Sequence, residues 1–275
     1  MEKIIVVINP TGIERMSLDF ACYLANLTGS KLTGLFLHQE PLMEVVEKPG
    51  IHFCHHVNET QVLPLISLEE IRQIKLEFHR FCSNHDLQWI PEMKEAVNIN
   101  HVILESRFAD LMILGAGSSF STEAEIIPSD TVTYTLKHAE CPVIVAPLTF
   151  NEVNEIVFTY DGSASSVFAI KQFTNLFPQF RDKKVIFLEV NDDYSHEISH
   201  KEMIVDYLET HYSSVGYQVL RGDPEDQIFS YFLNKKKAFA IMGAFGKKII
   251  PSIFNRSTAT LLLKTTSLPV FISHK

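Results

Sequence analysis

The sequence contains one pattern of apolar runs and turns twice, and this repeat limits the fold more than any other feature. The apolar runs 4–8 and 156–160 each lead through a polar turn into an amphipathic helical pattern and a second apolar run. A later run in each half ends at a glycine, Gly115 or Gly243, and each half closes on a Pro-Val pair. A repeat of this kind predicts two copies of one structural unit.

Strands alternate with helical segments in both copies, which predicts an α/β fold with right-handed crossovers. At 275 residues the chain has room for two domains of about 100–150 residues each. We predict domains at residues 1–149 and 150–275, each an open doubly wound sheet of five mainly parallel strands flanked by helices. Ligands of such sheets bind beyond the carboxyl ends of the strands, where the strand order reverses.

Composition excludes several classes of function. The net charge of −9 argues against nucleic-acid binding, which needs clustered Lys and Arg. Apolar runs fall short of the roughly 20 residues of a membrane span. The four cysteines lack any C-x2-C spacing, so we expect reduced and mostly buried thiols. These features together predict a cytoplasmic protein with no nucleic-acid or membrane partner.

Residues 238–258 carry the strongest functional signal. An apolar strand-like run, 238–242, is followed by Gly243 and Gly246, and then by Ser257 and Thr258 at the start of a new helical pattern. A strand, a glycine-bearing loop and a helix N-terminus present backbone N–H groups to an anion, so this stretch predicts a phosphate site. Positive charge would come from Lys247, Lys248 and Arg256.

Both halves then resemble the universal stress protein family in its tandem form, over nearly the whole chain. The second half has an Asp161-Gly162-Ser163 turn after its first strand, and its loop keeps the family's G-x2-G-x9-G-[S/T] spacing from Gly243 through Gly246 to Ser257. Arg256 departs from the pattern, which has glycine there. The resemblance implies a flavodoxin-like, adenine-nucleotide-hydrolase-like fold in each domain.

The resemblance also implies a bound adenine nucleotide, ATP with Mg²⁺, in the second domain alone. Asp161 would accept hydrogen bonds from the ribose or adenine end, and Val190 and Met242 would flank the adenine. Arg256 could either clamp the phosphates or fill their space. The full set of nucleotide-binding residues implied is Asp161, Gly162, Val190, Met242, Gly243, Gly246, Arg256, Ser257 and Thr258.

The first copy departs further from the family pattern. Asn9 stands where the second copy has Asp161, and the loop after Gly115 carries Glu123 and Glu125, which would repel phosphate. An acid at the next helix start, Asp130, already satisfies the helix dipole. We therefore predict that this domain has lost nucleotide binding and acts as a structural partner.

Other readings stay open. One alternative is an interaction or scaffold protein without nucleotide, acting through the 39–64 loop or the inter-domain groove. A weaker one is a slow ATPase, although no catalytic residue can be named and nothing in the sequence requires an enzyme. The family's pairing through its closing strand implies an intrachain pseudo-dimer, or a homodimer.

Two clusters outside the predicted nucleotide site have both a functional and an ordinary structural interpretation. A histidine-rich stretch could bind a metal, although a surface loop is the favoured interpretation; its residues are His52, Cys54, His55 and His56. Lys235, Lys236 and Lys237 are expected at a solvated helix end.

Overall fold

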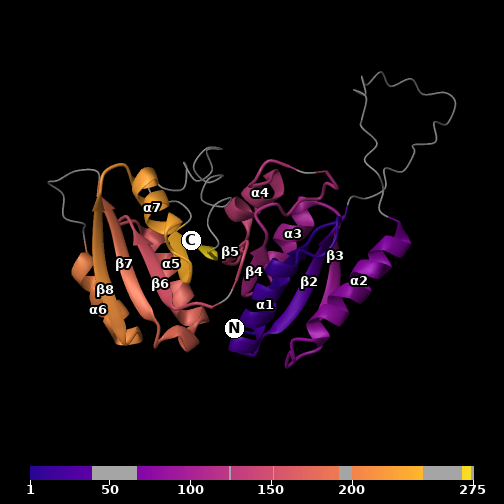
Figure 1. The fold of residues 1–275 in the computed structure, drawn as a ribbon, viewed down its shortest axis with the longest axis horizontal. Helices are drawn as coiled ribbons and strands as arrows, with labels where there is room; N and C mark the ends of the chain where they lie inside the picture. The colour runs from indigo at the N-terminus through magenta and orange to yellow at the C-terminus, as the bar shows by residue number, and fades with distance from the viewer. Residues whose placement is uncertain (39–66, 124, 151, 192–199, 244–267, 274–275) are drawn as a thin grey trace, which may run out of the picture.

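A computed structural model describes residues 1–38, 67–123, 125–150, 152–191, 200–243 and 268–273. Its described strands form one ten-stranded sheet in the order β3-β2-β1-β4-β5-β10-β9-β6-β7-β8. Helices cover both faces of this sheet, and the two halves of the chain lie side by side (Figure 1). The predicted α/β class with a mainly parallel sheet is confirmed. No described helix has the length and apolar character needed to cross a membrane.

The described residues of the first half form nine elements. They are β1 (Lys3–Ile8), α1 (Arg15–Thr28), β2 (Lys31–Leu37), α2 (Leu68–Ser83), β3 (Glu92–Ala96), α3 (Ile99–Ser106), β4 (Leu111–Leu114), α4 (Asp130–His138) and β5 (Val143–Val145).

The second half repeats this order of strands and helices. It contains β6 (Glu155–Tyr160), α5 (Ala164–Leu176), the 3₁₀ turn η1 (Pro178–Phe180), β7 (Lys184–Asn191), α6 (Lys201–His211), β8 (Ser214–Arg221), α7 (Pro224–Leu233), β9 (Ala238–Gly243) and β10 (Val270–Ser273). The helix predicted near residues 257–265 lies outside the described residues.

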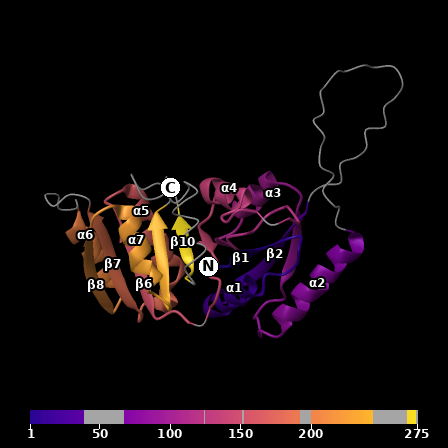
Figure 2. The ribbon, with the colours of Figure 1, turned by 45° about the horizontal axis from the view of Figure 1, so that its top comes forward.

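The two halves present their strands in mirrored order and meet at their closing strands. β5 and β10 pair antiparallel, with Ile144 opposite Phe271, whereas every other strand pair in the sheet is parallel. Figure 2 shows β10 in yellow near the middle of the molecule. Pairing each closing strand with the other leaves no unpaired edge at the centre. The predicted intrachain pairing of the two halves is confirmed.

Each face of the sheet has its own apolar core, because successive side chains of a strand point to opposite faces. One core lies between the sheet and the helices α1, α2, α5 and α6. The other lies between the sheet and α3, α4 and α7. The helices therefore sit in two layers, and the polar ends of the strands are left at the two rims of the sheet.

Aromatic rings continue the first of these cores across the junction between the halves. Phe20 of α1 lies 6.0 Å from Phe239 of β9, and 4.9 Å from Phe150 in the connection between the halves, measured between ring centroids. Phe239 in turn lies 5.0 Å from Phe173 of α5 in an edge-to-face arrangement. Such pairs add to the free energy of burial. These ring contacts therefore join the core of the first half to that of the second.

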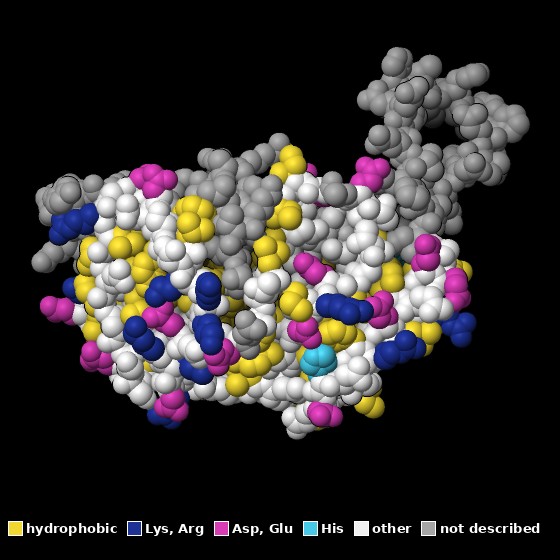
Figure 3. Space-filling view, viewed as in Figure 1, with side chains coloured by type: hydrophobic (Ala, Val, Ile, Leu, Met, Phe, Trp, Pro, Cys, Tyr) yellow, Lys and Arg dark blue, Asp and Glu magenta, His cyan; other side chains and the backbone are white. Residues whose placement is uncertain are grey.

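The lysines after α7 lie at a solvent-exposed helix end, as predicted, and two of them also form ion pairs with distant residues. α7 ends at Leu233, and Lys235 pairs with Glu155 at the start of β6 while Lys237 pairs with Glu152. On the face shown in Figure 3, basic and acidic side chains lie next to one another, as such ion pairs require. These two lysines therefore fasten the end of α7 to the first residues of the second half, which lie far away in the sequence.

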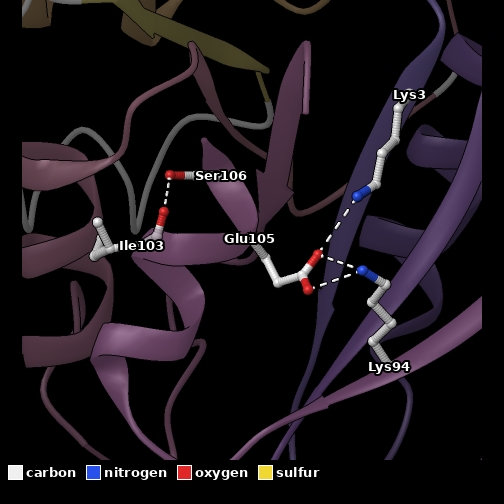
Figure 4. Close-up of polar contacts among 5 residues, drawn as sticks. All are labelled: Lys3, Lys94, Ile103, Glu105 and Ser106. Atoms are coloured by element: carbon white, nitrogen blue, oxygen red, sulfur yellow. Dashed lines mark hydrogen bonds and ion pairs between the residues drawn. The ribbon is translucent and has the colours of Figure 1, made fainter. Parts of the chain in front are cut away.

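A second ion-pair network docks α3 on the sheet. Both carboxylate oxygens of Glu105 lie 2.8 Å from Nζ of Lys94 in β3, and one lies 3.4 Å from Nζ of Lys3 in β1 (Figure 4). At the C-terminal end of α3, Ser106 Oγ donates a hydrogen bond to the carbonyl oxygen of Ile103. Burial of the Glu105 carboxyl acts to raise its pKa, but Lys94 and Lys3 outweigh it and lower the pKa below 4.5.

Replacing Glu105 with Gln should lower the free energy of unfolding by about 1 kcal/mol at neutral pH, since the two lysines lose their shared carboxylate. A folded-state pKa below the unfolded value stabilises the protein above the unfolded pKa of 4.5, and this stabilisation is lost as pH falls through the folded pKa. Urea denaturation of both proteins from pH 7 to pH 3 should therefore show the difference shrinking below pH 4.5. A difference that stayed constant over this range would contradict the assigned role of the carboxylate.

Candidate functional site

The strand order brings three of the predicted site residues to one rim of the sheet. β6 lies between β7 and β9. The strands that follow it are therefore placed first on one side, β7 and β8, and then on the other side, β9 and β10. Asp161 directly follows β6, Val190 is the second-last residue of β7, and Gly243 is the last residue of β9. The carboxyl ends of neighbouring parallel strands lie at the same rim, and a reversal of strand order opens a crevice there. The structure thus brings together three residues that are separated by up to 82 positions in the sequence.

The Asp161-Gly162-Ser163 turn connects β6 to α5 in a fixed conformation. The backbone N–H of Ser163 donates to Oδ1 of Asp161 at 3.0 Å, and Gly162 has a φ of 77°. A side chain strongly disfavours that backbone conformation, so glycine suits the position. Ser163 then caps α5, its Oγ accepting from the N–H of Ser166 at 3.1 Å. The turn holds the Asp161 carboxylate at the rim of the sheet, beside the start of α5.

Gly243 lies against the first turn of α5. A Cβ atom at this position would lie 2.5 Å from the carbonyl carbon of Ser165 and 2.6 Å from the nitrogen of Ser166. Both are backbone atoms, which cannot move aside as the end of a side chain can. The absence of a side chain at Gly243 therefore lets β9 and α5 meet next to the Asp161 turn. The resemblance assigns this glycine to a ligand, and the structure adds a helix–strand contact.

The predicted adenine-flanking residues belong to one face of the sheet. Met242 is buried in the core beneath α3, α4 and α7, and Val190 is partly buried against the same core. Among the other predicted residues, Gly246, Arg256, Ser257 and Thr258 lie outside the described residues. The described part of the predicted site therefore consists of Asp161, Gly162, Val190, Met242 and Gly243.

A buried carboxylate that the sequence reasoning missed lies beside this crevice. Glu189 of β7 is 3% exposed, accepts a hydrogen bond from the hydroxyl of Tyr217, and is in register with Tyr160. Burial raises the pKa of Tyr160, and the charges of Asp161 and Glu189 raise it further. An acid inside the apolar run 185–190 was the available signal, because charged residues are rarely buried without a partner. The rim near Asp161 is therefore rich in hydrogen-bond acceptors.

At the corresponding rim of the first half, the chain's own side chains contact the loop after β4. Asn9 follows β1 as Asp161 follows β6, and its Oδ1 accepts a hydrogen bond from the N–H of Ser119 at 3.3 Å. The Glu14 carboxylate lies against Gly115, since a Cβ there would be 1.9 Å from its Oε2. Glu125 accepts a hydrogen bond from the hydroxyl of Ser119. These contacts occupy backbone and side-chain donors that an anionic ligand would need.

A longer turn explains how Glu14 reaches this position. The N-cap of α1 is Glu14, five positions after Asn9, whereas the N-cap of α5 is Ser163, two positions after Asp161. Glu14 makes no side-chain cap bond; its Oε2 accepts from Ser17 Oγ at 2.9 Å and faces Gly115. The sequence reasoning identified Asn9, Glu123 and Glu125 but missed Glu14. The signal available in the sequence was the greater length of the turn after the first strand of the first half, compared with the Asp161 turn of the second half.

The histidine-rich cluster considered as a metal site, His52, Cys54, His55 and His56, lies outside the described residues. Within the part of the chain that the structure describes, no three or more His, Cys, Asp or Glu side chains are grouped so that they could hold a metal ion.

Comparison with known proteins gives matches among solved structures. No protein-family model matches the sequence, and no curated protein matches it significantly. A universal stress protein from Archaeoglobus fulgidus DSM 4304 superposes with a TM-score of 0.66 at 15% identity, covering 98% of this chain and 96% of its own. A protein assigned as a universal stress protein from Pseudomonas aeruginosa UCBPP-PA14 has a TM-score of 0.57 at 14% identity, with coverage of 100% and 93%.

A third match, a protein of unknown function from Pseudomonas aeruginosa PAO1, has a TM-score of 0.56 at 15% identity and covers 100% of this chain and 92% of its own. In all three matches the similarity extends over almost the full length of both chains, through both halves of the sheet. The chain therefore has the fold of the universal stress proteins, at the full length of these structures.

Proposed function

We propose that the second half of this protein binds an adenine nucleotide, ATP with Mg²⁺, and senses it without catalysis in a cytoplasmic stress response. The observation that carries the proposal is the placement of Asp161 and Gly243 on adjacent strands at the reversal of strand order. Doubly wound sheets bind their ligands at this position. The resemblance in motif order and the likeness in fold support the same assignment.

The chemistry of the described residues suits the sugar and base end of the ligand. Asp161 and the backbone around it offer acceptors for ribose hydroxyls, and a carboxylate can accept several hydrogen bonds at once. Val190, which is partly exposed, offers apolar surface for the flat adenine ring, and Met242 lies buried in the core beneath the same face of the sheet. Acidic groups would repel phosphates, so we assign the phosphate contacts to the loop from Gly246 to Thr258. Arg256 would then supply the positive charge.

Calorimetric titration with ATP and Mg²⁺ tests this proposal. Asp161→Asn keeps an oxygen that can accept from the N–H of Ser163, so the turn should persist while the charge is lost. We expect this variant to bind ATP about tenfold more weakly, which is ~1.4 kcal/mol, and Gly246→Val to bind more weakly still. Absence of heat from the wild type at millimolar ATP would rule the proposal out.

Asn9→Asp is the matched control, because Asn9 is the first-half counterpart of Asp161. If nucleotide binds in the second half alone, this variant should leave the ATP affinity unchanged. An affinity that changed as much in Asn9→Asp as in Asp161→Asn would move the site to the first half. Phosphate release followed in the same samples separates sensing from slow ATP hydrolysis, which would appear as turnover above the buffer rate.

The alternative is an interaction protein that binds no nucleotide. It is favoured by the first-half crevice, where Asn9, Glu14 and Glu125 already occupy the ligand position. In that case the wild type would show no ATP binding, and deletion of residues 44–60 would abolish its interactions or its phenotype in cells. Retention of both after the deletion would exclude the 39–64 loop as the interacting segment.

A further inference from the structure

Helix α2 is fastened to α1 along one face of α1. Oδ1 of Asp19 lies 3.0 Å from Nε2 of His85, and Nδ2 of Asn26 donates to the carbonyl oxygen of His85 at 2.7 Å. Between these two positions lies Cys22, at the i, i+3, i+7 spacing that places side chains on the same side of a helix. On the α2 side, the backbone N–H of His85 donates to the carbonyl oxygen of Cys82 in the last turn of α2, and Cys82 belongs to the same core as Cys22. The helix contact therefore has a pair of cysteines at its centre.

The two thiols lie in the same apolar core and are sealed from solvent. Cys22 is fully buried and Cys82 is 1% exposed, and both belong to the core beneath α1 and α2. Both are free thiols. The neighbouring Cys82 thiol, together with burial, raises the pKa of Cys22. Because the thiolate is the reactive form, the pair is protected from oxidants as long as α2 stays in place.

α2 is the less firmly anchored of the two helices. It buries Ile74, Phe78 and Cys82 out of 16 residues, whereas α1 buries seven of its 14. It lies at the outer end of the first half, beside the edge of the sheet (Figures 1 and 2). Peripheral elements with few buried contacts open locally at a lower free energy than the rest of a protein. Opening of α2 would expose both sulfur atoms together.

We propose that Cys22 and Cys82 form a redox-sensitive disulfide site that locks α2 onto α1. With hydrogen peroxide as the oxidant, one thiolate attacks an oxygen and becomes a sulfenic acid, breaking the O–O bond and releasing one water after protonation. The second thiol attacks that sulfur, forming the S–S bond and releasing the second water. Two thiols and one peroxide thus give one disulfide and two waters. Dithiothreitol reverses the reaction by thiol–disulfide exchange.

Peptide mapping of the full-length protein after peroxide treatment tests the site. A Cys54→Ser background removes the one cysteine outside the described residues. We expect a peptide pair linked through Cys22 and Cys82, lost after dithiothreitol, and a thermal midpoint about 5–10 °C higher in the oxidised protein. Recovery of both cysteines as free thiols, or of sulfinic acid at either without a linked peptide, would overturn the proposal.

Single replacements separate the pair from other thiols. Cys82→Ala should abolish the rise in midpoint on oxidation, and Cys141→Ala should retain it, because Cys141 is buried in the opposite core. If Cys82→Ala fails to fold, the linked peptide in the parent protein still decides the matter. Low urea should speed oxidation of the parent by favouring the open form of α2. A rate of oxidation independent of urea would contradict the opening step.

Discussion

Replacing Phe173 with Ala should lower the free energy of unfolding by about 3–5 kcal/mol. The Phe173 side chain is fully buried and has ring neighbours on four other elements of the second half, β6, η1, β9 and β10. Its centroid lies 5.0 Å from that of Phe239 in β9 and 5.3 Å from that of Phe271 in β10, both edge to face. Phe271 belongs to the strand that pairs with β5. A cavity here would therefore weaken the second half and its junction with the first.

Urea denaturation followed by circular dichroism measures this effect. Phe108→Ala is the matched control, since the same side chain is removed from a position that is 67% exposed. We expect little change in that variant. Equal losses in the two variants would mean that the aromatic cluster does not carry the stability assigned to it.

Gly243→Ala should destabilise the protein by about 2–3 kcal/mol, because the added methyl group meets the backbone of α5 and forces the helix away from β9. The displacement would reach the Asp161 turn at the start of α5, so ATP affinity should fall as well. Thermal denaturation and calorimetry on the same sample would measure the two effects. The pairing of both effects in one variant would connect the helix contact to the proposed site.

Gly117→Ala provides the control for this prediction. A Cβ at Gly117 would meet nothing closer than 3.9 Å, from a side-chain atom of Ile127, so the methyl group fits in ordinary contact. We expect its stability and its ATP affinity to match the wild type. Destabilisation by Gly117→Ala of the same size as by Gly243→Ala would point to the backbone freedom of glycine, and not to the contact with α5.

The repeat in the sequence predicted most of the fold because its signals are local. Apolar runs such as 4–8 and 156–160 became strands β1 and β6, and Ser163 caps α5 through a hydrogen bond within one turn. An acid before a proline is also a local helix-start signal, and Oδ1 of Asp223 accepts from the N–H of Asp226 in the first turn of α7. Period and capping act within a few residues, so they can be recognised without tertiary contacts.

Lys235 and Glu14 mark the limit of such reasoning. Lys235 was expected at a solvated helix end, and it also pairs with Glu155, 80 positions earlier in the chain. Glu14 lies against Gly115, about a hundred positions later. Neither partner can be identified from local sequence, because their proximity results from the order of strands in the sheet. The same holds for Glu189, whose burial depends on its neighbours Tyr160 and Tyr217.

The sequence by itself determined the two-copy α/β plan, because periodicity and turn chemistry are properties of short segments. The pairing of the closing strands and the residues proposed to bind nucleotide were implied by the resemblance to the universal stress proteins. Only the tertiary structure decided that Asn9, Glu14 and Glu125 make contacts with the loop after β4, and that Cys22 and Cys82 share one core. The physical reason is that packing against a sheet joins residues by strand order and helix face, whatever their distance along the chain.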